Sequence, residues 1–223
     1  MLWTLDLHSW DIPAASWLEL LSEEERAQYQ RFRANKDRLA YAAAHALLRR
    51  ALSQILKVPP ALLVFARDTM GKPFLAAPGD VKIDFSLSHT AGMVAVALSE
   101  AGKVGVDVET LDQRIDPLQD LFAFGMSPEE KTHLVALAEP ERSEAFIELW
   151  TAREAVAKAD GRGLSLPFNR IQIDRSGNFA TIAADETRPS RKWRLWREYA
   201  TPAHRLAVAA PENSNLIRMD ALI

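Results

Sequence analysis

The alternation of hydrophobic and polar residues predicts two series of helices and strands along the chain. Residues 2–7 alternate and predict an opening strand. A run without Pro or Gly, from Ser22 to about Leu56, predicts either one helix or two that break near Ala34–Asn35. Ser22 and Glu25 have the spacing of a capping box, in which each residue bonds the backbone of the other. This pair therefore marks the start of the helical run.

Short apolar runs punctuated by Gly and Pro predict strands after each helical region. In the first half these strands are 62–66, 74–75, 82–87, 93–98 and 104–108. Ser127 and Pro128 start a second helical region, because Ser suits the N-cap and Pro the first turn. A further helix runs from about Pro140 to Ala159 and ends at Gly161. The last predicted strands are 171–173, 181–183, 192–196 and 205–209.

This order of elements predicts an α+β fold built from two similar lobes in one chain. The length of 223 residues suits one large domain or two small lobes. No linker of biased composition marks a boundary, and residues 98–102 are the best place for it. We therefore assign residues 1–100 to an N-terminal lobe and residues 101–223 to a C-terminal lobe.

Composition excludes several classes of protein. The net charge of -3 gives no reason to expect nucleic-acid binding, and the lack of Cys excludes disulfides, thiolate nucleophiles and Cys-ligated metals. The most apolar run, Ala91–Leu98, is far shorter than the roughly 20 residues needed to span a bilayer, and the N-terminus does not resemble a signal peptide. We therefore expect a cytoplasmic protein without a membrane partner. The sequence also lacks the P-loop, dinucleotide-binding, H-E-x-x-H and G-x-S-x-G motifs.

The motif GVDVE places two carboxylates on one face of a strand. Asp107 and Glu109 are two residues apart, which is about 6–7 Å along a strand. Such carboxylates repel each other unless a cation lies between them, and oxygen ligands with open positions suit Mg²⁺. The alternative is a pair of acids on a solvent-exposed strand end.

The segment WTAREAVAKADGRGLSLP places Trp150, Glu154 and Lys158 on one face of a helix. Apolar neighbours indicate that this helix is packed, so its charged residues need partners, which a metal ion and a phosphate would supply. The alternative is an exposed Glu–Lys pair of small energetic value.

Two further motifs are less specific. In SLSHT, Ser88 and His89 end an apolar run, and His89 is either a phosphate ligand or proton carrier, or a structural hydrogen-bonding residue. In MGKPFL, the turn at Gly71–Lys72–Pro73 offers backbone amides and an ammonium group that could meet an anion.

Taken together and in order, these motifs resemble those of 4′-phosphopantetheinyl transferases, in particular the larger, surfactin-synthetase-activating (Sfp) type. The resemblance spans nearly the whole sequence. It implies a pseudo-twofold fold of two α/β lobes with the active site at the lobe interface. It also implies an enzyme that moves 4′-phosphopantetheine from coenzyme A to a serine of an acyl or peptidyl carrier protein and releases adenosine 3′,5′-bisphosphate. Mg²⁺, or Mn²⁺ in its place, would be required.

The resemblance also assigns roles to individual residues. The implied metal ligands are Asp107, Glu109 and Glu154. The implied catalytic residues are Glu154 as the base for the serine proton, Lys158 as a neutralising charge, and His89. The implied coenzyme A contacts are Lys36, Arg67, Gly71, Lys72, Pro73, Ser88, His89 and Lys158.

Three departures from the family pattern are visible. Arg153 stands where Lys is common, and we expect little effect because the charge is kept. Some members have additional basic residues near the positions of Glu25, Gln28 and Ala40, which are not basic here, and Arg31, Arg33, Arg38 or Arg67 could substitute for them in holding the 3′-phosphate. The apolar group Phe122–Phe124–Met126 is either core or a docking surface for the carrier protein.

Two lobes in one chain would complete the site, so we expect a monomer. Two alternative functions remain open at this point: a protein that binds coenzyme A or a nucleotide without transfer, and a Mg²⁺-dependent phosphohydrolase. The phosphohydrolase would use the same carboxylates on water, whereas a mere binding protein has no need of Asp107, Glu109, Glu154 and Lys158 together. The sequence does not identify the carrier protein or its pathway.

Overall fold

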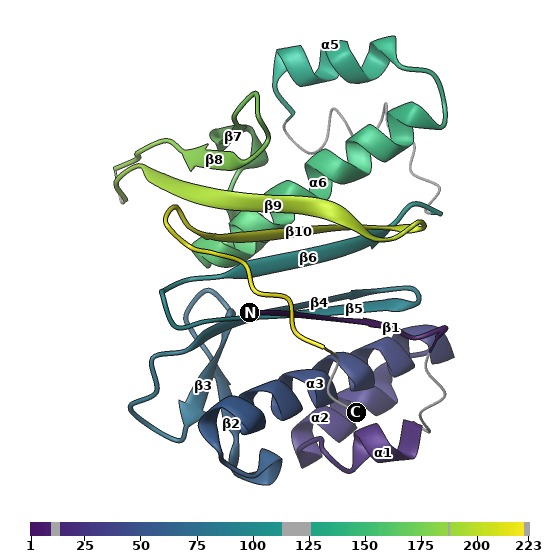
Figure 1. Ribbon diagram of the computed structural model, residues 1–223, viewed down its shortest axis with the longest axis vertical. Coiled ribbons are helices and arrows are strands. Elements are labelled where there is room, and N and C mark those ends of the chain that lie inside the picture. The colour runs from purple at the N-terminus through teal and green to yellow at the C-terminus, as the bar shows by residue number, and fades with distance from the viewer. Residues whose placement is uncertain (10–13, 113–125, 187, 221–223) are drawn as a thin grey trace.

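Two antiparallel sheets lie between two long helices, which gives the molecule four layers (Figure 1). The computed structural model describes residues 1–9, 14–112, 126–186 and 188–220. A three-stranded sheet has the order β1-β5-β4, a five-stranded sheet has the order β6-β10-β9-β8-β7, and β2 pairs with β3 alone. Helix α3 covers the first sheet, and helix α6 covers the second (Figure 1). The predicted α+β fold of two similar lobes is confirmed.

The elements follow each other in this order along the chain. Those of the first half are β1 (Leu2–Asp6), α1 (Ala14–Leu18), α2 (Glu23–Arg31), α3 (Asn35–Leu56), η1 (Pro60–Leu62), β2 (Val64–Arg67), β3 (Pro73–Ala77), β4 (Asp84–Thr90) and β5 (Met93–Ser99). Those of the second half are β6 (Gly105–Thr110), α5 (Pro128–Ala136), α6 (Glu141–Asp160), η2 (Gly163–Ser165), η3 (Phe168–Arg170), β7 (Ile171–Ile173), β8 (Phe179–Ile182), β9 (Arg191–Thr201) and β10 (His204–Pro211).

The predicted helical run is two helices, and its break is where the sequence indicated. Helix α2 ends at Arg31 and α3 begins at Asn35. The capping box is present, since the Glu25 amide donates to Ser22 Oγ over 3.2 Å and the Ser22 amide donates to Glu25 Oε2 over 2.8 Å. Ser127 caps α5 in the same way. Helix α1 was not predicted, because its five residues are too few to show a helical period.

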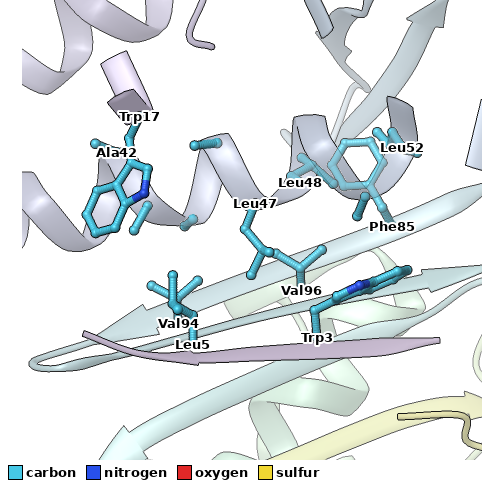
Figure 2. Packing of buried hydrophobic residues seen from close by; sticks show 14 of the residues in the cluster. Trp3, Leu5, Trp17, Ala42, Leu47, Leu48, Leu52, Phe85, Val94 and Val96 are labelled. Atoms are coloured by element: carbon cyan, nitrogen blue, oxygen red, sulfur yellow. The ribbon is translucent and has the colours of Figure 1, made fainter. Parts of the chain in front are cut away.

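The core of the N-terminal lobe lies between α3 and the inner face of the three-stranded sheet. Figure 2 shows Leu47 of α3 pointing toward Val96 of β5, next to Trp3 of β1, while Leu48 lies beside Phe85 of β4. Trp3 is fully buried. The alternation of the strands therefore directs one apolar face of the sheet at the helix.

In the C-terminal lobe, α6 packs on β6 and β10. Gly105 allows this close approach, because a Cβ at that position would lie 1.9 Å from the carbonyl oxygen of Ala155. Arg153 is buried and binds both carboxylate oxygens of Glu130, at 2.5 and 2.6 Å, which connects α6 to α5. Arg153 is therefore a structural residue of the helix pair.

A third apolar cluster joins the two sheets. Val106 and Val108 of β6 are buried together with Met93 and Ala95 of β5. The segment after β10 returns to the first sheet, where the Leu2 amide donates to the Ile217 carbonyl oxygen over 2.8 Å. Residues assigned to the C-terminal lobe thus also pack on the N-terminal one.

Two further expectations concern particular segments. Phe122 and Phe124 lie outside the described residues, whereas Met126 is buried against α5 and α6. Among the helices that the structure describes, none combines the length and apolar character needed to cross a membrane.

Candidate active site

The centre of the candidate site is a triangle of three side chains from different elements. Lys158 of α6 donates to Asp107 Oδ1 of β6 over 2.7 Å and to Ser88 Oγ of β4 over 3.1 Å. Ser88 in turn donates to the same Asp107 oxygen over 2.8 Å. Asp107 is 3% exposed, so its carboxylate is shielded from water, while the Lys158 side chain is partly exposed. Sequence motifs that lie 70 residues apart therefore meet at one point.

The charge around Asp107 is incompletely balanced. Its second oxygen, Oδ2, is buried and has no hydrogen-bond partner among the described residues. Burial and then the negative charge of Asp107 raise the pKa of Glu154, while Lys158 lowers it. A buried carboxylate oxygen without a donor, next to a second carboxylate, fits a divalent cation.

The third implied ligand, Glu109, lies two residues along β6. Thr90 Oγ1 of β4 is 3.5 Å from Glu109 Oε2. In the part of the chain that the structure describes, no three His, Cys, Asp or Glu side chains already form a metal-binding cluster. Carboxylates repel each other without a cation, so convergence of Glu109 and Glu154 on Asp107 would accompany binding.

Side chains join β4 to β6 along their whole length, and we call this line of contacts the seam. Ser86 Oγ accepts the Val106 amide over 3.0 Å, two residues before the Ser88–Asp107 contact. At one end, Asp84 Oδ2 accepts the Val104 amide over 2.8 Å and Lys72 Nζ over 2.7 Å. The hydroxyls of the S-x-S-x-T pattern thus hold the two lobes together around the site.

Lys72 has a different environment from the one that the resemblance implies. Its ammonium group bonds Asp84 and also the Val104 carbonyl oxygen, which is 3.1 Å away. Burial lowers the pKa of Lys72, and Asp84 opposes that change. The side chain therefore serves as a contact between the lobes in this structure, while Gly71 forms the adjacent turn with φ of 85°.

His89 lies one residue after Ser88 on β4. Burial, followed by the positive charges of His45 and Lys158, lowers its pKa. The imidazole therefore acts as a neutral hydrogen-bonding group at neutral pH in the absence of an anion.

A pocket of about 650 Å³ opens in the N-terminal lobe between α3 and Leu87 of β4. Its walls include Tyr41, His45, Arg67 and Pro73. The Tyr41 and His45 rings are in contact, with centroids 4.2 Å apart and planes tilted by 34°. Burial, followed by the charge of Glu25, raises the pKa of Tyr41 to about 12, so its hydroxyl keeps its proton.

A buried ion pair supports the floor of this pocket. Glu25 bonds His45 Nδ1 at 2.9 Å and Arg49 Nε at 2.8 Å. Burial alone would raise the pKa of Glu25, but the bonds from His45, Arg49 and the Ser22 amide outweigh it and lower the pKa to about 2. Glu25 is thus ionised, and its negative charge is balanced by its partners. It therefore adds little net negative charge to the pocket.

A second pocket of about 200 Å³ lies between the lobes. Gly71, Lys72 and Lys158 line it, together with Pro73, which also lines the first pocket. The two pockets are therefore adjacent, with Arg67 in the wall of one and Lys158 in the wall of the other. Lys36 is exposed at the start of α3 and is not among the described residues that line either pocket.

Sequence reasoning missed several residues of this region. Tyr41, His45 and Arg49 are spaced four residues apart on α3, so a polar stripe at helical spacing was the available signal. Asp84 gave no signal, because its role depends on how the two lobes meet.

Comparison with known proteins supports a family assignment. A model described as the 4′-phosphopantetheinyl transferase superfamily matches residues 103–210, and one for the N-terminal part of 4′-phosphopantetheinyl transferases matches residues 3–101. The 4′-phosphopantetheinyl transferase HetI of Nostoc is 30% identical over 168 residues, which is 72% of this chain and 70% of HetI. The chain belongs to the 4′-phosphopantetheinyl transferase superfamily. The two family models together cover both lobes, which meet at the seam.

Two other phosphopantetheinyl transferases show the range of this similarity in identity and in coverage. The enzyme gsp of Aneurinibacillus migulanus is 30% identical over 156 residues, 70% of this chain, and the match spans 62% of the length of gsp. Sfp of Bacillus subtilis is 23% identical over 215 residues, which is 93% of this chain and 92% of Sfp.

Proposed function

We propose that this protein transfers the 4′-phosphopantetheine group from coenzyme A to a serine of an apo acyl or peptidyl carrier protein, with adenosine 3′,5′-bisphosphate as the second product. The observation that carries the proposal is the buried Ser88–Asp107–Lys158 triangle between the lobes, with one carboxylate oxygen unpartnered among the described residues. Family membership, together with a match to Sfp that extends over nearly the whole of both chains, favours the Sfp type.

The donor set fits a divalent cation, with Mg²⁺ proposed and Mn²⁺ as its substitute. Asp107, Glu109 and Glu154 would hold it. When bound, such an ion supplies positive charge to the diphosphate of coenzyme A.

Lys158 and Ser88 bind and orient the reacting diphosphate. Lys158 already carries its ammonium group into the space between β4 and β6, where it can neutralise charge on the transferring phosphoryl group. Ser88, whose hydroxyl would turn from Asp107 to the ligand, and the neutral imidazole of His89 would donate hydrogen bonds to phosphate oxygens. Phosphoryl transfer depends mainly on positioning and charge stabilisation, which these residues supply.

Glu154 is the proposed base. Its raised pKa makes its carboxylate a better proton acceptor than an exposed glutamate. The carrier serine oxygen attacks the phosphorus that bears the pantetheine group and passes its proton to Glu154. The bond from that phosphorus to the bridging diphosphate oxygen breaks, and its electron pair leaves with adenosine 3′,5′-bisphosphate.

The adenosine part of coenzyme A would lie in the two adjacent pockets. Pro73 borders both, and Gly71 turns the backbone next to them. Arg67 lines the larger pocket, whereas the Lys72 ammonium is engaged by Asp84. We therefore propose Arg67 as the main contact of the 3′-phosphate. Lys36 is at most a peripheral contact there.

The two lobes, residues 1–100 and 101–223, would each supply one side of the site. Ser88 comes from the first, and Asp107 and Lys158 come from the second. A single chain thus holds every proposed group, which supports a monomeric enzyme whose protein partner is the carrier.

Mass spectrometry of the carrier tests this function. The full chain is incubated with coenzyme A, Mg²⁺ and an apo carrier domain, in parallel with Glu154→Gln and Glu141→Gln. Glu141 is exposed in the first turn of the same helix, so its variant is the matched control. We expect the parent and the control to add one phosphopantetheine mass to the carrier, and Glu154→Gln to add none.

The alternatives give different results. Binding of coenzyme A without a mass gain in any carrier of a broad panel would identify a binding protein. Cleavage of the diphosphate without a carrier would identify a phosphohydrolase. Full activity of Glu154→Gln would refute its role as base and ligand.

A further inference from the structure

His204 lies at the end of the seam opposite Asp84. It is the first residue of β10, is 5% exposed, and pairs with Thr110 at the end of β6. Its ring crosses to the other lobe, where Nε2 lies 2.8 Å from the carbonyl oxygen of Ala91. Ala91 directly follows β4 and is 113 residues away in sequence. His204 therefore connects the end of β6 to the end of β4.

The hydrogen-bond partners of His204 define how its ring is used. A carbonyl oxygen accepts only, so Nε2 must carry the hydrogen that is donated to Ala91. Nδ1 lies 2.7 Å from Thr201 Oγ1, and the same hydroxyl oxygen accepts the Ala203 amide over 3.2 Å. In the neutral ring with its hydrogen on Nε2, Nδ1 accepts from the Thr201 hydroxyl. Each ring nitrogen of His204 thus has a hydrogen-bond partner, and these two bonds fix the orientation of the ring.

The local strand geometry places His204 for this contact. Strand pairing between β9 and β10 shifts register between His204 and Arg205, as in a β-bulge. Such bulges redirect side chains and occur beside active sites. Arg205 reaches Glu148 on α6, while His204 reaches the N-terminal lobe.

The turn that His204 contacts is also held from its other side. The Leu7 amide donates to the Gly92 carbonyl oxygen over 2.8 Å. The His8 ring fills the space next to Gly92, since a Cβ there would lie 2.4 Å from His8 Nε2. Gly92 has φ of 83°, which glycine adopts readily. The turn after β4 is thus fixed between both lobes.

We propose that His204 is a positioning residue: its bond to Ala91 holds Ser88 and His89 at a set distance from the carboxylates of β6. The expected effect of His204 on the transfer rate rests on the proposed function, in which Ser88 and His89 would contact phosphate and Asp107 would hold the cation. Loss of the bond frees the end of β4. A displacement of about 1 Å in such a site can cost up to 100-fold in rate.

Three substitutions separate hydrogen bonding from packing. In His204→Gln, the amide nitrogen is close to the position of Nε2 and can still donate to Ala91. In His204→Asn, the amide is too short, and in His204→Leu no donor is left. The stability control is Ile171→Val, because Ile171 is buried in β7, at the sheet edge opposite β6. That change lowers Tm by about 2–4 °C without touching the seam.

Two measurements are made on each full-length variant. Hydrogen exchange of the peptide over residues 89–93 reports the turn directly and requires no activity. The transfer assay gives kcat and the KM for the carrier. We expect the Asn and Leu variants to exchange faster at 89–93 and to lose about 10-fold in kcat with unchanged carrier KM. The Gln variant should stay within about 3-fold of the parent, and Ile171→Val should keep the parental kcat.

The outcomes distinguish the two proposals. Equal behaviour of the Gln and Asn variants in both measurements, or unchanged exchange at 89–93 in all three, would overturn the positioning role. Should the Leu variant fail to fold, the Gln–Asn pair still decides. An inactive parent combined with faster exchange in the Asn variant would remove the proposed function and leave the contact between His204 and Ala91 supported.

Discussion

Gly105 gives a sharp test of how the fold builds the site. A Cβ at this position would lie 1.9 Å from the Ala155 carbonyl oxygen and 2.5 Å from the Ala159 amide nitrogen, both of them backbone atoms of α6. Neither atom can rotate away. In Gly105→Ala, β6 and α6 must therefore separate by about 1 Å, and overpacking of this kind against backbone costs about 2–4 kcal/mol. That loss is a large part of a total stability of about 5–15 kcal/mol.

The same separation disturbs the chemistry. Lys158 and Asp107 lie on the two elements that move apart, and their contact is 2.7 Å long. We expect transfer to fall by about 100-fold even at temperatures where the variant is folded. Urea unfolding measures the stability loss, and the transfer assay measures the rate loss.

Gly79→Ala is the matched control for this experiment. No atom lies within 4 Å of the position that a Cβ would take at Gly79, and its φ is not positive. Its stability should stay within about 0.5 kcal/mol of the parent, with unchanged transfer. If Gly105→Ala proves as stable and as active as Gly79→Ala, the close approach of β6 and α6 does not position the site.

Three further outcomes are expected. Glu25 has a pKa of about 2, below its ordinary value of 4.5, so its ion pair stabilises the fold above pH 4.5 and is lost as the pH falls toward 2. The unfolding free energy of the parent should therefore drop more steeply over that pH window than that of Glu25→Gln. Parallel curves for the two proteins would contradict this. Arg153→Ala should cost about 3–5 kcal/mol in urea unfolding, because it leaves Glu130 without its buried partner, and a loss below about 1 kcal/mol would be incompatible with that role. Arg67→Ala should weaken binding of coenzyme A about 10-fold in calorimetry but hardly affect dephospho-coenzyme A, which lacks the 3′-phosphate; equal losses would reassign Arg67.

Local signals explain what could be predicted of the fold. Caps at Ser22 and Ser127 act within four residues, so the sequence alone located the starts of α2 and α5. Strand limits were less accurate: 192–196 was expected where β9 spans Arg191–Thr201. The residues that follow 196, Arg197 to Thr201, are mostly polar, so pairing with β10 and not hydrophobicity extends the strand.

The site was predictable to the extent that it lies in compact motifs. Ser88, Asp107 and Lys158 each belong to a distinct motif, and the fold brings all three together. Lys72 and His204 depend instead on partners from the other lobe. No periodicity in the sequence reports such contacts, because they arise only when the two sheets pack together.

The central claim is that carboxylates of β6 and α6 share one divalent ion with the diphosphate of coenzyme A. The most direct measurement is an anomalous difference map from crystals grown with Mn²⁺ and coenzyme A. We predict one manganese peak within bonding distance of Asp107 Oδ2, a Glu154 oxygen and the diphosphate. A bound coenzyme A with its manganese held by neither Asp107 nor Glu154 would contradict the account.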